Sequence, residues 1–390
     1  MTTAEPRSAH PFAMYDEMHG QPQAIAAALT ADMPQRDHIA RELAGTHAAT
    51  ETIVGPGFLM PHIVGPGRIW LVGCGTAHHA ALIAADWLRQ GSEHILDAQA
   101  MQAFEFAHYS SRKLRAHDTL LALSHSGTPT AMIAAATRAR ETGMYSVAVT
   151  AIPDSPLTRI CDETLLTHSG PTVAGTYTIS HTAMLATLAD LTRRAVNHLR
   201  NEHAQAEELA VETARFPELA QAMLDAEPGI KDVIAALPDL GQLIVGGGGP
   251  NWPTALEGAL KVREAAYLAA TGLEIEEIVH GPVASIDAAT GVLLIVPAGP
   301  SHARALDILR AVRHVGATTI VITAAGDAES AALADHVIAL PDCDESSSVI
   351  PATIAVQEIA YWLAIKRGGN PDRIRREQPQ WEAARQSYTR

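Results

Sequence analysis

Residues 69–80, IWLVGCGTAHHA, join an apolar run to a glycine turn and then to the start of an amphipathic stretch. TLLALS (119–124) leads in the same way into a helix expected from about Pro129, and YSVAVTA (145–151) is a third apolar run. Short apolar runs that alternate with helical stretches are typical of parallel strands joined by right-handed crossovers. The pattern predicts an α/β fold whose doubly wound parallel sheet is covered by helices on both faces.

The same alternation begins again in the second half of the chain. Its apolar runs are GQLIVGGGG (241–249), GVLLIVPA (291–298), TTIVITAA (318–325) and HVIAL (336–340). Helices are expected from about Trp252, over 301–315 and over about 350–367. Two tandem domains of flavodoxin-like or Rossmann-like type are therefore predicted.

Helices are also expected at roughly 16–30 and 34–53, and the helical stretch that joins the two halves is interrupted by Pro217, Pro228 and Pro238. We divide the chain into five parts: an N-terminal tail with helices (1–55), a first sheet domain (56–200), a helical bridge (201–236), a second sheet domain (237–368) and a C-terminal tail (369–390).

Composition excludes several classes of protein. The 390 residues carry a formal charge of −15 and 4% aromatic residues, which argues against nucleic-acid binding. Three cysteines, Cys74, Cys161 and Cys343, have no paired spacing, as expected in a reducing compartment. The N-terminus does not have the pattern of a leader, and no uninterrupted apolar stretch is long enough to span a membrane. A cytoplasmic protein without a membrane partner is predicted.

The loop Ser124-His125-Ser126-Gly127-Thr128-Pro129-Thr130 follows the second apolar run. In an open parallel sheet, ligands bind beyond the carboxyl ends of the strands. Hydroxyl groups beside a helix N-terminus are suited to a phosphate, although the same residue types also serve as simple helix caps. We favour the phosphate interpretation because so many hydroxyl groups share one loop.

Signals for a cofactor or a metal are weak. The turn from Gly73 to His78, with Asp97 about twenty residues on, resembles a dinucleotide fingerprint, but His78 stands where its third glycine belongs. The 19 histidines are scattered, and neither an H-E-x-x-H helix nor a cysteine cluster is present. We expect no cofactor and no metal.

The segment ALEGALKVRE (255–264) places Glu257, Lys261 and Glu264 on one helical face. For an isolated helix such a set is most simply a solvated, paired face. Here the helix starts after a glycine-rich strand end, and His280 stands in a Gly-Pro turn further along. A carboxylate and a histidine are the groups needed to move a proton between two sugar carbons and to open the ring.

These segments, in this order, resemble the sugar isomerase (SIS) family, and within it the isomerase part of glutamine–fructose-6-phosphate aminotransferases. The resemblance runs from about Met14 to about Asp372. Its matching pieces are MYDEMHGQPQAI (14–25), GCGTAHHA (73–80), LSHSGTPT (123–130), VAGTYTISHT (173–182), GGGGPNWPTALEGALKVREAAY (246–267), VHGP (279–282) and VQEIAYWLAIKRG (356–368).

The resemblance implies a role for each matched site residue. Glu264 is implied to be the base, Lys261 its neighbour and His280 the ring-opening acid/base, contributed by the second subunit of a homodimer. The phosphate and sugar contacts are implied to be Thr76, Ser124, His125, Ser126, Thr128 and Thr182. The family's hydroxyl groups are replaced at Ala77 and Pro129, which alters the phosphate loop.

The chain begins at the isomerase portion, so we expect no glutaminase domain and exclude the aminotransferase reaction. The tail also has no counterpart of the aminotransferase's C-terminal lysine. The predicted protein is an enzyme, a phosphosugar isomerase or deaminase that acts on an amino-sugar or keto-sugar phosphate of the glucosamine-6-phosphate or fructose-6-phosphate type. A fructosamine-6-phosphate deglycase is the first alternative, and a non-catalytic sugar-phosphate sensor is the second.

Overall fold

The computed structural model describes residues 7–46, 51–53, 62–64, 67–110, 114–170, 172–200 and 213–388. The chain divides into two compact units. The first-sheet unit holds Ile25–Gly170 and Ala183–Ala214, and the second-sheet unit holds Met1–Ala24, Pro171–Thr182 and Arg215–Tyr388. Each unit is described by itself below.

The first-sheet unit contains a five-stranded parallel sheet in the order β4-β3-β5-β6-β7. Its strands are β3 (Arg68–Gly73), β4 (Asp97–Gln102), β5 (Thr119–Leu123), β6 (Tyr145–Thr150) and β7 (Glu163–Leu166). Its helices are α3 (Met33–Thr46), α4 (Thr76–Gly91), α5 (Ala103–Tyr109), α6 (Thr130–Thr142) and most of α2 (Gln21–Thr30) and α7 (Ile179–Arg200). A short antiparallel pair, β1 (Glu51–Ile53) and β2 (His62–Val64), precedes the sheet.

The second-sheet unit contains a parallel sheet in the order β12-β11-β10-β8-β9. Its strands are β8 (Gln242–Gly247), β9 (Ala269–Glu274), β10 (Thr290–Val296), β11 (Thr318–Ala324) and β12 (His336–Leu340). Its helices are α1 (Ala13–His19), α9 (Phe216–Asp225), α10 (Glu227–Ala236), α11 (Asn251–Ala266), α12 (His302–His314), α13 (Ala328–Leu333), α14 (Val349–Arg367) and α15 (Pro379–Gln386), with 3₁₀ turns η1 (Glu276–Val279) and η2 (Pro282–Ser285).

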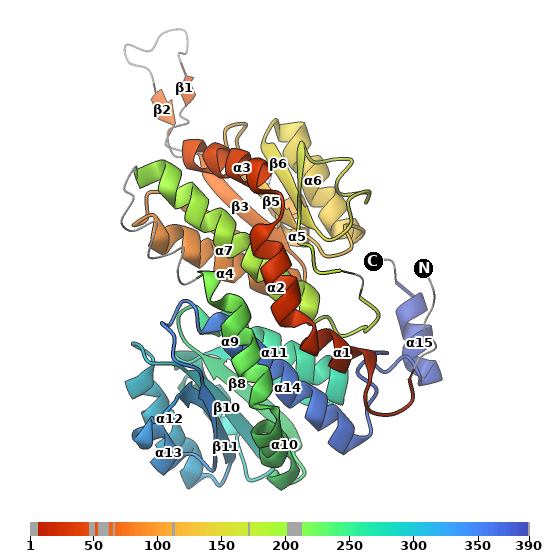
Figure 1. Ribbon diagram of the computed structural model, residues 1–390, viewed down its shortest axis with the longest axis vertical. Helices are drawn as coiled ribbons and strands as arrows, with labels where there is room; N and C mark the ends of the chain where they lie inside the picture. The colour runs from red at the N-terminus through yellow and green to blue at the C-terminus, as the bar shows by residue number, and fades with distance from the viewer. Residues whose placement is uncertain are drawn as a thin grey trace. The chain divides into compact units, whose positions relative to one another are not determined.

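The two sheets share one topology. Numbered along the chain within each unit, both strand orders read 2-1-3-4-5, the flavodoxin-like arrangement. Helices flank each sheet (Figure 1). The predicted α/β fold with two tandem doubly wound sheets is confirmed.

A glycine at the end of the first strand has the same task in both units. A Cβ atom on Gly73 would lie 2.6 Å from the carbonyl carbon of Ala77, and one on Gly247 would lie 2.3 Å from the carbonyl oxygen of Asn251. Both contacts are with backbone, which cannot move aside as a flexible side chain does. Glycine therefore lets each following helix start directly against its strand.

The apolar runs predicted the six central strands and one edge strand, β12. Every residue of β5 and of β10 is buried, as expected for strands covered on both faces. The edge strands β4, β7 and β9 went unpredicted, because their sequences DAQAMQ, ETLL and AATGLE contain few apolar residues and are only partly buried.

Three helix boundaries differ from the prediction. The helix expected over 16–30 is two helices, α1 and α2, separated at Gly20, and the helix expected over 34–53 ends at Thr46. Residues 51–53 form strand β1 instead, since β-branched Thr52 and Ile53 favour strand. Residues 47–50 lie outside the described part of the chain.

The helical stretch of the predicted bridge is divided beside its prolines, since α9 ends at Asp225 before Pro228 and α10 ends at Ala236 before Pro238. Pro217 and Pro228 stand in the first turns of α9 and α10, where a proline's missing N–H would have had no helical partner. Both helices pack against α14 in the second-sheet unit, and residues 201–212 lie outside the described part of the chain. The boundaries proposed for the bridge stay a prediction.

Helix α14 is the central helix of the second-sheet unit. By length and composition alone it could cross a membrane, but 89% of its most apolar 18-residue window is buried within the structure. It packs against α11, α9 and α10 and against the start of the chain at α1. We therefore assign its apolar character to the core of this unit.

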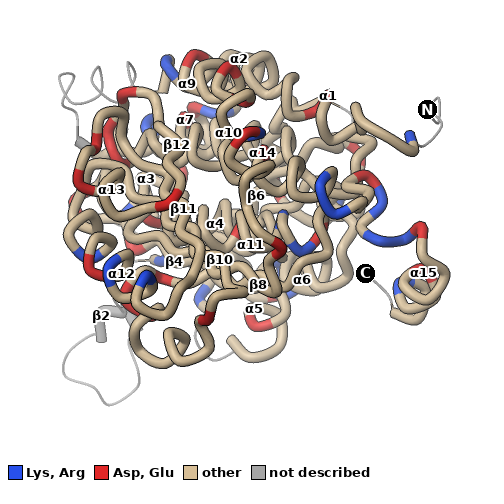
Figure 2. Tube along the Cα trace, turned by 90° about the horizontal axis from the view of Figure 1, so that it is seen from below, with Lys and Arg blue, Asp and Glu red and all other residues tan. Residues whose placement is uncertain are grey.

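Charged residues of both signs are interspersed along the described trace (Figure 2). Arginines gather in the segment that precedes α15, where Arg376 pairs with Glu382 at 2.6 Å and the Arg375 guanidinium lies 3.7 Å from the Trp381 ring centroid. The C-terminal arginines named here are thus engaged by the helix that follows them.

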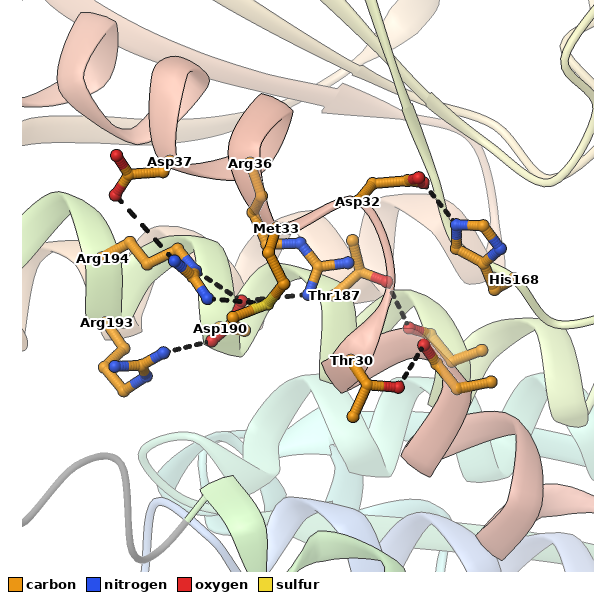
Figure 3. A network of polar contacts seen from close by, with 12 residues as sticks. Thr30, Asp32, Met33, Arg36, Asp37, His168, Thr187, Asp190, Arg193 and Arg194 are labelled. Atoms are coloured by element: carbon orange, nitrogen blue, oxygen red, sulfur yellow. Dashed lines mark hydrogen bonds and ion pairs between the residues drawn. The ribbon is translucent and has the colours of Figure 1, made fainter.

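A buried ion pair joins α3 to α7 in the first-sheet unit (Figure 3). Arg36 Nη1 lies 3.0 Å from Asp190 Oδ2, and the two side chains are 0% and 4% exposed. Arg193 and Arg194 also donate to Asp190, at 2.6 and 2.8 Å. Burial alone would raise the pKa of Asp190, but these three arginines outweigh it and lower the pKa below its usual value.

We expect Asp190→Ala to lower the free energy of unfolding by about 3–5 kcal/mol, because it leaves Arg36 buried without a counter-charge. Arg193→Ala is the matched control and should cost about 1 kcal/mol or less, since Arg36 and Arg194 still neutralise Asp190. Urea titration followed by circular dichroism measures both values. Equal losses in the two variants would contradict the assignment of Arg36 as the dominant partner.

Candidate functional site

The loops after β3 and β5 leave the first sheet at its topological switch point. The two strands are hydrogen-bonded neighbours although β4 lies between them in sequence, and Val72 is opposite Ala122. In sheets of this order a crevice opens where neighbouring loops run in opposite directions. Thr76 starts α4 on one side, and the loop of residues 124–130 leads to α6 on the other. The structure therefore brings Thr76 and the predicted phosphate loop to the same edge of one sheet.

Hydrogen bonds shape the loop between Ser124 and Thr128. The buried Ser124 Oγ accepts a hydrogen bond from the Gly127 N–H at 3.1 Å. Ser126 Oγ and Thr128 Oγ1 lie 2.8 Å apart. The His125 carbonyl is held by the Thr150 hydroxyl at 2.9 Å and by the Ala151 N–H at 3.1 Å. Ser126 and Thr128 thus present paired hydroxyl groups on a loop whose backbone is fixed.

Gly127 is required by this loop for two reasons. Its φ of +64° lies in the left-handed region, and a Cβ atom there would come within 2.1 Å of Ser155 Oγ. Its carbonyl accepts from the Leu157 N–H at 3.1 Å. Burial lowers the pKa of His125, so this imidazole is neutral at physiological pH.

The hydroxyl groups of this loop do not act as the helix cap that was the alternative interpretation. The N-cap residue of α6 is Pro129, and no side chain makes a capping hydrogen bond there. This arrangement favours the phosphate interpretation, which stays a prediction.

In the second-sheet unit, Lys261 links two carboxylates on α11. Its Nζ lies 3.3 Å from Glu257 Oε1 and 2.6 Å from Glu264 Oε2. Glu257 and Lys261 are 0% exposed, whereas Glu264 is 23% exposed. The face is paired, as expected for an isolated helix, but it is not solvated, because α14 packs against α11. Glu264 is the member of this triad that a ligand can reach.

Charge neutralisation keeps this triad in the core. Burial on its own would lower the pKa of Lys261, but the two carboxylates outweigh it, and the pKa lies above the usual value. Lys261 is thus a permanent cation that cannot serve as a base. It can hold Glu264 in one position.

Glu264 and His280 lie near opposite ends of the strands of this sheet. Glu264 is near the ends at which the strands start, and His280 is near the ends at which they finish. Since α11 connects the parallel strands β8 and β9, it runs antiparallel to them, and Glu264 in its last turn is close to the start of β9. His280 follows the far end of β9, whose six residues span about 20 Å. Within this unit the two side chains do not converge.

The imidazole of His280 is 62% exposed and is oriented by a carboxylate. Its Nε2 lies 2.9 Å from Glu276 Oε1, and Arg304 on α12 holds the same carboxylate with bonds of 2.5 and 2.6 Å. Arg304 and His280 lower the pKa of Glu276, which therefore stays charged. Sequence reasoning missed Glu276 and Arg304, because no motif joins α12 to η1.

Thr182 occupies a different environment from the other predicted sugar contacts. It is fully buried, and its hydroxyl group donates to Gln21 Oε1 at 2.9 Å. Gln21 and Thr182 both lie in segments that carried the family resemblance. Their hydrogen bond ties the start of α7 to the start of α2.

A sequence profile of the SIS domain matches residues 62–191 and 237–367, and each match contains one of the two sheets. The chain belongs to the SIS domain family. One relative is the isomerizing glutamine–fructose-6-phosphate aminotransferase of Pyrococcus horikoshii, 32% identical over 308 residues that make up 79% of this chain and 50% of the relative. The chain spans about half the length of the curated relatives it matches.

Several solved structures share this fold over nearly their whole length. The C-terminal domain of glucosamine–fructose-6-phosphate aminotransferase from Francisella tularensis has a TM-score of 0.81 at 22% identity, covering 93% of this chain and 98% of that one. Tagatose-6-phosphate ketose/aldose isomerase from Escherichia coli gives 0.74 at 20% identity, with coverages of 96% and 98%. Glucosamine-6-phosphate deaminase from Thermotoga maritima gives 0.68 at 17% identity, with coverages of 93% and 97%. At these identities the likeness shows the shared fold.

We expect Lys261→Met to destabilise the protein by about 3–5 kcal/mol, because it leaves the fully buried Glu257 without a cation. Glu264→Gln is the matched control. It keeps the Lys261–Glu257 pair and changes a partly exposed group, so a smaller loss is expected. Urea unfolding of both variants tests this, and an unchanged midpoint for Lys261→Met would contradict the buried-triad assignment.

Proposed function

We propose that this SIS protein is a phosphosugar isomerase or deaminase that acts on an amino-sugar or keto-sugar phosphate by a 1,2-proton shift. The observation that carries the proposal is Glu264, a partly exposed carboxylate hydrogen-bonded to a buried, permanently charged Lys261. A carboxylate held in this way is suited to remove a proton from carbon and return it to the neighbouring carbon. The names of the relatives and structural neighbours support the same class of substrate.

In the proposed reaction, His280 transfers the proton that opens the sugar ring. Glu264 then takes the C2 proton of the aldose form, which gives a planar enol or enamine, and delivers a proton to C1. With an amino sugar the product is a ketose imine, to which water adds at C2 as ammonia leaves. With a neutral sugar the sequence ends at the ketose.

The phosphate group is assigned to the loop of residues 124–128. Its paired hydroxyl groups and the adjoining helix N-terminus offer hydrogen-bond donors without a fixed positive charge. Thr76, from the neighbouring loop at the same sheet edge, is assigned to the sugar. Thr182 is assigned to positioning instead, because its buried hydroxyl group is bonded to Gln21.

We further propose a homodimer in which His280 serves the active site of the partner subunit. Glu264 and His280 lie near opposite ends of the strands of one sheet, which supports an active site to which two chains contribute. The imidazole's 62% exposure leaves it available to a neighbouring chain.

We expect Glu264→Gln to lower kcat by about 10²–10⁴-fold with little change in substrate binding, because the amide cannot accept the C2 proton. Purified protein is incubated with glucosamine 6-phosphate, fructose 6-phosphate or a fructosamine 6-phosphate, and released ammonia, ketose phosphate and free amine are measured. Release of amine from the fructosamine phosphate, with no product from the other two substrates, would favour the deglycase. Binding without turnover of any of these substrates would favour the sensor.

A mixed-subunit experiment tests the origin of His280. Glu264→Gln and His280→Asn are each inactive in the proposed scheme, but a dimer that contains one of each has one intact site if His280 acts across the interface. After random mixing, about half of the dimers are hybrids, and each hybrid has one intact site out of its two. About a quarter of the wild-type activity should therefore return. No recovery after verified subunit exchange would contradict the shared site.

A further inference from the structure

Three metal-binding side chains from distant segments meet in the second-sheet unit. They are His19 at the end of α1, Glu227 at the start of α10 and Glu358 in the middle of α14. One ligand atom from each lies within 4.8 Å of the other two. We propose that these residues bind one divalent transition-metal ion, with Zn²⁺ the best fit, and that the ion fastens α1 and α10 to the core helix α14.

The hydrogen bond of His19 fixes which ring nitrogen faces the cluster. Nδ1 lies 2.9 Å from the carbonyl oxygen of Tyr15, which can only accept, so Nδ1 carries a proton. In the neutral imidazole, Nε2 then presents a lone pair toward Glu227 Oε2, 3.2 Å away. Two lone pairs at this distance repel each other unless a proton or a cation lies between them. A histidine that donates Nδ1–H to a backbone carbonyl is the usual orientation of a metal ligand.

Glu358 supplies a second reason to place a cation here. The residue is fully buried, and Oε1 has no hydrogen-bond partner, while Oε2 accepts from Trp362 Nε1 at 3.1 Å. A buried carboxylate oxygen without a hydrogen-bond donor is costly, and a metal ion would provide both a contact and a counter-charge for Oε1.

A divalent ion balances the charge of this cluster. Two carboxylates and a neutral imidazole together carry −2, which a divalent ion brings to zero. The nearby Tyr15 hydroxyl group donates a hydrogen bond to Glu227 Oε2 at 3.1 Å. The nearby cation Lys231 lies 4.4 Å from the centroid of the Trp362 ring, on an aromatic face instead of a carboxylate.

The spacing also fits a tetrahedral ion. Bonds of about 2.0–2.2 Å at the tetrahedral angle put two ligand atoms about 3.3–3.6 Å apart, slightly more than the 3.2 Å between His19 Nε2 and Glu227 Oε2. The Glu358 carboxylate, within 4.8 Å of both of these atoms, supplies the third ligand. His19 is 35% exposed and Glu227 16% exposed, which leaves a path for the ion and room for water as the fourth ligand.

The test uses the full-length protein, stripped with a chelator and titrated with Zn²⁺, Mn²⁺ or Mg²⁺ by isothermal calorimetry. We expect one Zn²⁺ per chain, a rise in melting temperature on binding and weaker binding of Mg²⁺, which prefers six oxygen ligands. Glu358→Gln and His19→Gln should each weaken Zn²⁺ binding at least about 10-fold. Co²⁺ added to the wild-type protein should give the visible absorption of a tetrahedral site.

His302→Gln is the matched control. His302 also pairs with a carboxylate, Asp327 at 3.0 Å, but is not part of the three-ligand cluster, so its loss should leave Zn²⁺ binding unchanged. Circular dichroism of each metal-free variant shows whether it has folded. If the wild-type protein takes up no stoichiometric ion, or if uptake persists in folded Glu358→Gln and His19→Gln, the proposal is overturned.

Discussion

Burial of a parallel sheet on both faces is the constraint on which the rest of the structure depends. Central strands such as β5 and β10 bury every residue, so helices must cover both sides and chemistry is confined to the strand ends. Close packing of each helix against its strand in turn requires glycine at positions 73 and 247. The same solution appears twice in one chain, in the same strand order.

The two units use this shared plan for different chemistry. In the first-sheet unit the switch-point loop offers hydroxyl groups from Ser126 and Thr128 and backbone groups, and His125 is neutral because it is buried. In the second-sheet unit the helix after the first strand carries the charged triad of Glu257, Lys261 and Glu264. The proposed phosphate contact rests on the first of these arrangements, and the proposed proton transfer rests on the second.

Buried charges recur at helix junctions in this protein. Arg36 and Asp190 join α3 to α7, Lys261 neutralises two carboxylates under α14, and His19, Glu227 and Glu358 bring α1 and α10 to α14. The first two clusters contain their own counter-charges. In the third, the buried Glu358 Oε1 has no hydrogen-bond partner, which is why a metal ion is inferred there.

Sequence by itself determined the α/β class, the two tandem sheets, the central strands and the helical face shared by Glu257, Lys261 and Glu264, because these follow from local periodicity. It did not determine the polar edge strands, the burial of that helical face or the partners of His280, since neighbours distant in the chain decide them. Only the tertiary structure placed Glu264 and His280 near opposite ends of the strands of one sheet, because the direction of α11 depends on the parallel pairing of β8 with β9. It alone brought His19 to Glu227 and Glu358, whose separation along the chain leaves no local pattern to read.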